Sequence, residues 1–194
     1  MSTGTVLAIV IAAAVLIVLI ATAFALDRRR RHRLRERFGP EYDRTVDEAG
    51  SRRAAEHDLG EREKRHESLD IRPLPDHVRE RYLREWEGVQ EQFVDRPEQA
   101  VHDADRLVTV LMRERGYPTE DFEQQARDLS VEHGRALERY REAHEIDGLT
   151  ASHRATTEQL RGAMVHYRAL FDELLSDGDQ ASDGDQADPG GPER

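Results

Sequence analysis

An uncharged run of 22 residues, 5–26, constrains this chain more than any other feature of its sequence. At a rise of about 1.5 Å per residue, such a run forms a helix about 33 Å long, whereas the hydrocarbon core of a bilayer is about 30 Å thick. The rest of the chain is rich in charged residues and has the composition of a water-soluble protein. The sequence therefore predicts that residues 1–26 form a transmembrane anchor.

A cluster of arginines, which we call the basic collar, follows the apolar run directly. Its members are Arg28, Arg29, Arg30, Arg31, Arg33, Arg35 and Arg37. By the positive-inside rule, the collar indicates a single-pass protein of the cell membrane, with its N-terminus outside and its C-terminal domain in the cytoplasm. Arginines beside a bilayer also attract anionic lipid headgroups, at about 1 kcal/mol each. We therefore expect the lipid bilayer and its anionic headgroups as partners.

A cleaved signal peptide is the alternative to an anchor. Two Ala-x-Ala triplets, at residues 21–23 and 23–25, could precede a cleavage site, and the mature chain would then begin at Phe24 or Leu26. Signal peptides begin with basic residues and have an apolar core of about 7–15 residues, but residues 1–4 carry no Lys or Arg and the core is longer. Early arginines also oppose translocation. The anchor is favoured, and cleavage would instead give an extracytoplasmic domain.

The composition excludes several classes of function. The chain contains no cysteine, which excludes disulfides, thiolate metal sites and cysteine nucleophiles. The net charge is -11 at pH 7 in spite of the basic collar, so the remainder is acidic. Because an acidic folded part is repelled by phosphate, we expect no nucleic acid partner.

Residues 27–75 are predicted to form the collar and a charged helical spacer. Gly39 and Pro40 should end the first helix, since Gly39 can adopt a positive φ and Pro40 cannot continue the hydrogen-bond ladder. Residues 41–70 contain few apolar side chains, so they favour a solvated helix supported by ion pairs between residues four apart. The prolines at 73 and 75 mark its end.

A compact antiparallel helical domain is predicted for residues 76–175. The first helix carries its apolar residues at helical spacing: Val78, Tyr82, Trp86, Val89 and Phe93. Similar stripes recur up to residue 174, which gives four or five helices and an all-α fold. The sequence does not decide whether residues 119–146 form one helix or two separated by a bend at Gly134.

Local signals predict where these helices begin and end. Asp76 and Thr119 are candidate N-caps, and Thr156 with Gln159 has the spacing of a capping box. Gly116 should end a helix whose last turn contains arginines. Residues 176–194 contain two copies of SDGDQA and too few apolar residues for a core, so they are predicted to be a disordered acidic tail.

A search for chemical motifs finds no catalytic, cofactor-binding or metal-binding set. Glu63 and His66 form the single Glu-x-x-His, whereas a di-iron bundle needs two. A second group, His102, Asp103 and Asp105, should point to water, and two further histidines, His144 and His166, should be hydrogen-bonded at the edge of the core. Neither a Gly-x-Ser-x-Gly motif nor a glycine-rich phosphate loop is present. We therefore expect a protein without enzymatic activity and without a cofactor.

The single tryptophan, Trp86, has two interpretations. In the middle of an apolar stripe it is expected to be a core residue, and the alternative is an anchor for a partner protein. An enzymatic or ligand-binding domain remains a further alternative, with a pocket between helices and polar contacts from Tyr82, His102, Tyr117, His133 and Tyr140.

Three stretches of the sequence occur together in one protein family. They are residues 37–44 (RFGPEYDR), residues 93–118, and residues 128–133 (DLSVEH). In this arrangement the chain, over residues 37–175, resembles an uncharacterised family of bacterial proteins, mostly from high-GC Gram-positive organisms, labelled as membrane or secreted proteins. The resemblance implies a bacterial, membrane-attached protein and assigns no activity to any residue. Together these observations predict a membrane-anchored protein whose cytoplasmic helical domain binds another protein or itself.

Overall fold

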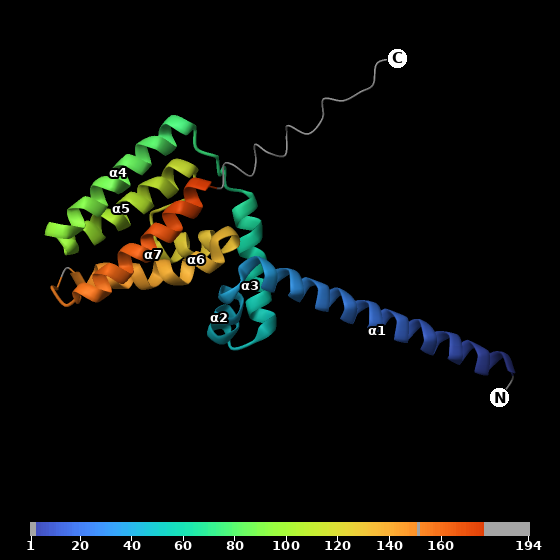
Figure 1. Cartoon of the computed structure of the whole chain (residues 1–194). Helices are drawn as coiled ribbons and strands as arrows, with labels where there is room; N and C mark the ends of the chain where they lie inside the picture. Colours follow the sequence, from blue (N-terminus) through green and yellow to red (C-terminus); the bar gives the residue numbers. More distant parts are fainter. Residues whose placement is uncertain (1–2, 151, 177–194) are drawn as a thin grey trace, which may run out of the picture.

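The computed structural model describes residues 3–150 and 152–176, and every residue of regular structure in these ranges is helical (Figure 1). Their seven helices are α1 (Thr3–Phe38), α2 (Pro40–Ala49), α3 (Arg52–Glu67), α4 (Asp76–Asp95), α5 (Pro97–Arg115), α6 (Phe122–Thr150) and α7 (Thr157–Ser176). The predicted all-α fold class is confirmed. The predicted disordered tail, apart from Ser176 at the end of α7, lies outside the described residues.

Helices α4–α7 form the predicted helical bundle, with α5, α6 and α7 in mutual contact and α4 against α5 (Figure 1). The predicted face of α4 is correct, because Val78, Tyr82, Trp86 and Val89 are buried and Phe93 packs at the edge of the core. The stripes of α5 and α7 are buried in the same cluster. Burial of these side chains away from water is the main term that holds the four helices together.

Some of the predicted helix ends are confirmed, but the predicted N-cap Asp76 is wrong, because Pro75 occupies the cap position and Asp76 is the first residue of α4. Thr156 and Gln159 form the capping box, since the Gln159 N–H donates to Thr156 Oγ1 at 3.3 Å and the Thr156 N–H donates to Gln159 Oε1 at 2.9 Å. Gly116 ends α5 with a φ of 100°. The predicted cap Thr119 is wrong: α6 begins later, and Asp121 Oδ2 accepts from the Gln124 N–H at 3.0 Å. The hydroxyl of Thr119 instead accepts from Arg113 Nε.

The structure answers the question that the sequence left open about residues 119–146. Helix α6 runs from Phe122 to Thr150 and bends at His133, whose φ of -114° and ψ of 31° are not helical. The next residue, Gly134, lies against the end of α1, where a Cβ would come within 2.4 Å of the Phe38 carbonyl oxygen. The bend therefore coincides with the place where α1 packs on α6.

The expectation that residues 41–70 form a solvated spacer is wrong. Helices α2 and α3 fold back beside the end of α1, and all three contact α6 (Figure 1). A second hydrophobic cluster, in which α1, α2, α3 and α6 each bury one or two side chains, lies between them: Leu34, Phe38, Tyr42, Leu59 and Val131. The sequence pattern is weak because no single helix contributes a complete apolar stripe.

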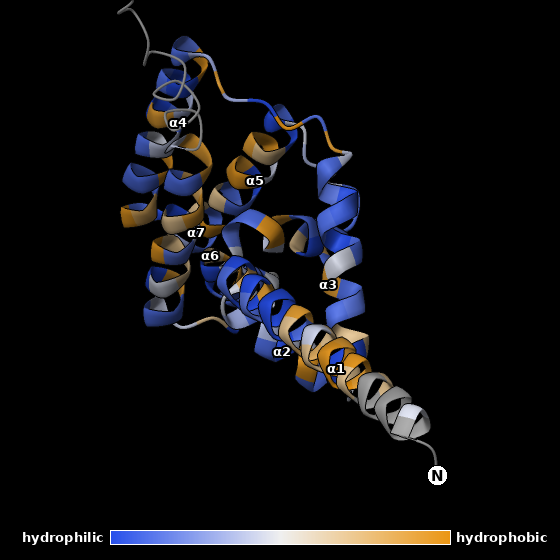
Figure 2. Ribbon diagram, turned by 90° about the vertical axis from the view of Figure 1, so that its right-hand side faces the viewer, coloured by the Kyte–Doolittle hydropathy of each residue, from blue (hydrophilic) through white to orange (hydrophobic). Residues whose placement is uncertain are grey.

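The remainder of α1 extends away from the body of the protein and carries the predicted anchor (Figure 2). Along it the residues change from hydrophobic to hydrophilic as the helix approaches α2 and α3. Eight large apolar side chains of this part are between 53% and 68% exposed: Val15, Leu16, Ile17, Val18, Leu19, Ile20, Phe24 and Leu26. The side chains of residues 3, 5–11 and 13, which include much of the predicted anchor, lie outside the described set. In the described part of the chain, no helix is both long enough and apolar enough to cross a membrane.

Candidate functional site

The basic collar lies at the junction of α1 with the helical body, and most of its arginines contact acidic residues there. Glu63 of α3 binds two of them, Arg33 at 3.0 Å and Arg37 at 3.1 Å. The remaining contacts of the collar with α2 and α3 are Arg31 to Glu56 at 3.4 Å, Arg30 to the Glu56 carbonyl oxygen at 3.4 Å, and Arg35 to Asp43 at 2.9 Å. The collar therefore attaches α1 to α2 and α3, a role that the sequence analysis missed.

Glu56 connects the collar to the second hydrophobic cluster. Its carboxylate is buried and accepts a hydrogen bond of 2.9 Å from the hydroxyl of Tyr42. Burial is the main cause that raises the pKa of Tyr42, and the hydrogen bond to Glu56 raises it further. The hydroxyl is therefore protonated at neutral pH and can donate. One carboxylate thus joins α1, α2 and α3.

A buried ionic triad fixes α2 and α3 to α6. Arg141 of α6 binds both oxygens of Glu41, at 2.5 and 3.0 Å, and Arg62 of α3 donates to Glu41 Oε1 at 3.0 Å. Glu41 is only 4% exposed. Burial would raise the pKa of Glu41, but the hydrogen bonds and charges of Arg141 and Arg62 outweigh it and lower the pKa below its ordinary value. The triad therefore holds an ionised carboxylate inside the protein.

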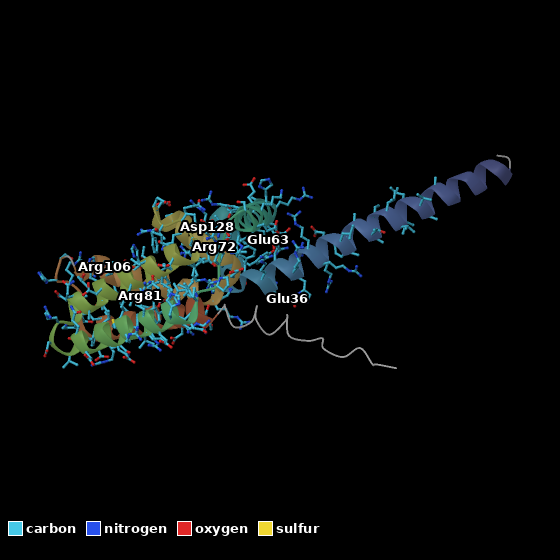
Figure 3. All side chains as sticks on the ribbon, turned by 90° about the horizontal axis from the view of Figure 1, so that it is seen from above. Glu36, Glu63, Arg72, Arg81, Arg106 and Asp128 are labelled. Atoms are coloured by element: carbon cyan, nitrogen blue, oxygen red, sulfur yellow. The ribbon has the colours of Figure 1, made fainter. Side chains whose placement is uncertain are left out.

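A second ion pair joins α3 to α6 on the other side of the bend. Asp128 is fully buried, and its Oδ1 accepts from Arg65 Nε at 2.9 Å and from Gln124 Nε2 at 2.9 Å. Figure 3 shows Asp128 and Glu63 in the region where α1 and α3 meet the body. With the triad, this pair attaches α3 to α6 at two points.

Trp86 is a core residue, as the first interpretation predicted. Its side chain is fully buried and stacks on Phe171 of α7, with ring centroids 4.8 Å apart. The guanidinium of Arg168 lies over the same ring system, 5.5 Å from the Trp86 centroid. The interpretation of Trp86 as a partner anchor is wrong, because the ring has no surface that a partner could contact.

The five polar residues of the pocket hypothesis do not meet in one cavity. Tyr82 lies between α4 and α5, and its hydroxyl is 3.5 Å from Glu114. Tyr117 and His133 lie near each other, with ring centroids 6.4 Å apart, whereas Tyr140 packs in the bundle core against Tyr167. His102 is exposed on α5 and lies 3.4 Å from Asp147 of α6. The structure therefore gives no support to a shared ligand pocket for this set.

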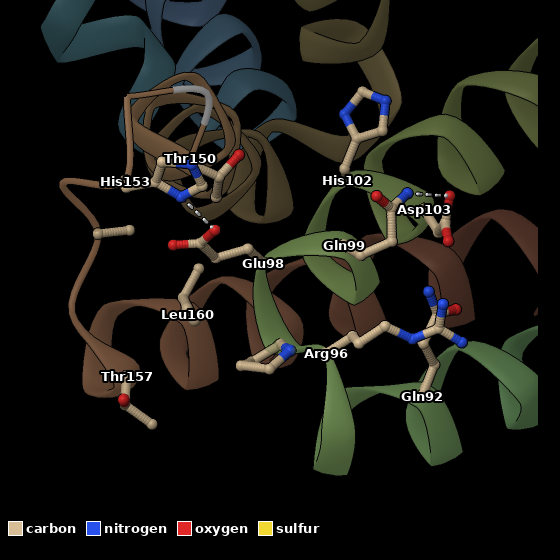
Figure 4. A pocket seen from close by; sticks show the side chains of 12 residues that line it. Gln92, Arg96, Glu98, Gln99, His102, Asp103, Thr150, His153, Thr157 and Leu160 are labelled. Atoms are coloured by element: carbon tan, nitrogen blue, oxygen red, sulfur yellow. Dashed lines mark hydrogen bonds and ion pairs between the residues drawn. The ribbon is translucent and has the colours of Figure 1, made fainter.

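A groove of about 920 Å³ lies at the end of the bundle near the α4–α5 and α6–α7 connections (Figure 4). His153 and Glu98 bind one another across it at 2.8 Å, and Gln99 donates to Asp103 at 3.2 Å. Since groups of both charge signs line the groove and bind each other, it does not present a set of polar groups directed at one ligand.

A hydrogen-bonded cluster around Asp105 was not predicted. Asp105 Oδ1 accepts from the Tyr167 hydroxyl at 2.9 Å and lies 3.1 Å from His144 Nδ1. The expectation that Asp105 points to water is therefore wrong, although His144 is hydrogen-bonded at the edge of the core as predicted. The hydrogen bond to Asp105 raises the pKa of His144, and burial opposes it. One helical turn separates Asp105 from the buried Val101, which is the sequence signal that could have placed it inward.

Among the residues that the structure describes, the histidines and acids do not assemble a metal centre. Glu63 is occupied by Arg33 and Arg37, and His66 lies 3.6 Å from Glu132, so the single Glu-x-x-His does not converge on one point. In residues 3–150 and 152–176, no group of three or more His, Asp or Glu side chains is arranged to hold a metal ion.

The fold and its charged junction define an all-α protein whose long N-terminal helix is fixed to a helical body by buried ion pairs. Comparison of the chain with protein-family models, with curated proteins and with solved structures finds no match. The function is therefore inferred from the physical properties of the chain alone.

Proposed function

We propose that the protein is a single-pass membrane protein in which α1 both crosses the bilayer and holds the helical body at the cytoplasmic surface, where the body binds another protein or itself. The observation that carries this proposal is the continuity of α1 from the uncharged run to Phe38.

The exposed apolar part of α1 supports the membrane location. Eight neighbouring large apolar side chains, from Val15 to Leu26, are more than half exposed. Soluble proteins rarely expose a contiguous apolar surface of this kind, and such surfaces mark membrane or protein contacts. The uncharged run of 22 residues has the length that a bilayer requires.

The collar supports the orientation and a fixed position of the body. Its arginines follow the apolar run, which favours the cytoplasmic side for everything after it. Because Glu56, Glu63 and Asp43 bind five of these arginines, α1 cannot swing freely against α2 and α3. The body is therefore presented at a defined angle to the helix that anchors it.

The proposed interaction role is supported by what the body contains. It has a well-packed core and ionic contacts that fix its shape, and the sequence and the described structure offer neither a catalytic motif nor an assembled metal site. A rigid helical module attached to a membrane is suited to binding a partner through its surface.

Fractionation of cells that express the full chain tests the membrane location. We expect the protein to stay in the membrane fraction after an alkaline carbonate wash, and Leu19→Arg to release it. Val94→Arg is the matched control, because Val94 is 83% exposed on α4, outside the apolar part of α1. Recovery of the unmodified chain in the soluble fraction would overturn the anchor.

Protease treatment tests the orientation, and cross-linking tests the interaction. We expect α4–α7 to resist protease in intact cells and to be digested after permeabilisation. Digestion in intact cells would overturn the cytoplasmic location and favour the extracytoplasmic alternative. If cross-linking in membranes captures neither a second copy nor another protein, the interaction role is wrong.

A further inference from the structure

We propose that α1 and the first turn of α3 together bind the headgroup of an anionic phospholipid, in a groove between them where Arg52 and Arg53 face the apolar part of α1. The inference rests on the proposed membrane anchoring and adds to it a second contact with the bilayer. It assigns lipid binding to residues of α3 that lie outside the basic collar.

The groove has a volume of about 570 Å³ and changes character from one end to the other. Its lining comprises Ile20, Ala23, Phe24, Asp27 and Arg31 of α1 and Arg52, Arg53 and Glu56 of α3. Ile20 and Phe24 are 61% and 68% exposed, so the apolar end is open. The charged end begins at Asp27, the first charged residue after the uncharged run. The groove therefore lies at the level where the acyl core of a bilayer gives way to its headgroups.

The acidic residues of the groove already have partners. Asp27 binds Arg31 at 2.9 Å, and Glu56 binds Arg31 at 3.4 Å and accepts from the Tyr42 hydroxyl. These two carboxylates share the single charge of Arg31. With Arg52 and Arg53 the three arginines and two carboxylates that line the groove have a net charge of +1, which favours an anionic ligand.

Arg52 and Arg53 are the cations that remain. Both are exposed, and within residues 3–150 and 152–176 neither takes part in an ion pair or a side-chain hydrogen bond. A guanidinium group binds phosphate oxygens through two parallel hydrogen bonds. Arg52 and Arg53 lie in the first turn of α3, where the helix dipole also favours an anion.

The fold brings these two arginines to the bilayer. Leu59 of α3 packs in the second hydrophobic cluster, and Glu56 and Glu63 bind the collar, so α3 runs beside α1. The α2–α3 turn at Gly50, with a φ of 64°, directs the start of α3 back toward the apolar part of α1. Since most collar arginines are engaged within the protein, the unpaired cations nearest to the headgroups include Arg52 and Arg53.

The shape and charge of the groove fit a phospholipid better than a free anion. An acyl chain can lie along Ile20 and Phe24 while a phosphate is bound by the two arginines. A soluble phosphate would use only the charged end. The expected ligand is therefore a phospholipid of the cytoplasmic leaflet, and phosphatidylglycerol is the probe.

Native mass spectrometry of the full chain, released from vesicles of phosphatidylcholine mixed with phosphatidylglycerol, tests the inference. We expect phosphatidylglycerol to be retained preferentially, and Arg52→Gln with Arg53→Gln to reduce this preference about fivefold for each arginine removed. The matched control, Arg84→Gln with Arg106→Gln, removes the same charge from exposed positions of α4 and α5. Circular dichroism checks that both double variants keep the helical fold.

The outcomes separate this inference from the proposed function. A chain that fails to float with vesicles of phosphatidylcholine alone contradicts the anchoring itself. A chain that floats with these vesicles, but whose phosphatidylglycerol preference is unchanged in the Arg52 and Arg53 variant or falls equally in the control, contradicts only the groove. Displacement of the lipid by inorganic phosphate would also overturn it, because the site would then recognise the anion without the acyl chain.

Discussion

Gly134 of α6 lies against the carbonyl oxygen of Phe38, the last residue of α1, so closely that a Cβ on Gly134 would come within 2.4 Å of that oxygen. This contact is where α1 meets the body. Since the neighbouring atoms belong to the main chain, they cannot move aside as the end of a flexible side chain would.

The first prediction concerns this contact. Gly134→Ala is expected to destabilise the protein by about 1–3 kcal/mol, because the added methyl group must push α1 away from α6. Gly88→Ala is the control: nothing lies within 4 Å of its Cβ position in α4, and alanine should stabilise that helix by about 0.5–1 kcal/mol. Chemical denaturation of the full chain in detergent measures both. Equal effects of the two substitutions would show that α1 does not pack against Gly134.

The second prediction concerns the buried triad. Replacement of Glu41 by Gln removes the charge that Arg62 and Arg141 share. It is expected to cost about 3–5 kcal/mol because Arg141 loses this carboxylate partner, whereas Arg62 keeps an ion pair with Asp58 at 2.6 Å. Glu48→Gln breaks the exposed pair with Arg44 at 2.7 Å and should change stability by less than about 1 kcal/mol. Urea denaturation compares the two variants, and a small effect at Glu41 would contradict the triad.

The parts of the fold that the sequence predicts correctly are those whose signals lie close together in the chain. The stripe through Val78, Tyr82 and Trp86 repeats within one helix, so its period alone identified the buried face. The capping box at Thr156 and Gln159 is equally local, and it too was predicted correctly. Each signal lies within about 20 residues, which is the range over which helical periodicity can be read.

The junction could not be predicted because its contacts join residues far apart in the chain. Glu41 and Arg141 are 100 positions apart, and Arg33 and Glu63 are 30 apart. In the sequence each is one charged residue among many, since 36% of the chain is charged. A charged side chain can be buried at low cost only when it is paired with an opposite charge, and the folded structure is needed to show which residues pair.

The third prediction concerns the dependence of stability on acid. The pKa of Glu41 in the folded protein lies below its ordinary value of 4.5, so the unfolded chain binds the proton more readily. The contribution of Glu41 to stability is therefore complete above pH 4.5 and is lost as the pH falls from there through the folded pKa. Denaturation between pH 6 and pH 3 should show a decline that is less steep in Glu41→Gln. An unchanged slope would mean that Glu41 does not retain its charge on folding.

The fourth prediction uses the single tryptophan of the chain as a probe of its own burial. Trp86 is fully enclosed between α4 and α7, where it stacks on Phe171, so its fluorescence should be blue-shifted and resistant to quenching by iodide until the protein unfolds. Trp86→Ala should cost about 3–5 kcal/mol because it leaves a cavity beside Phe171, whereas Trp86→Phe keeps much of the contact and should cost less. If iodide quenches the folded protein as strongly as the unfolded one, the ring is accessible. Trp86 would then again be a candidate for the residue that a partner protein contacts.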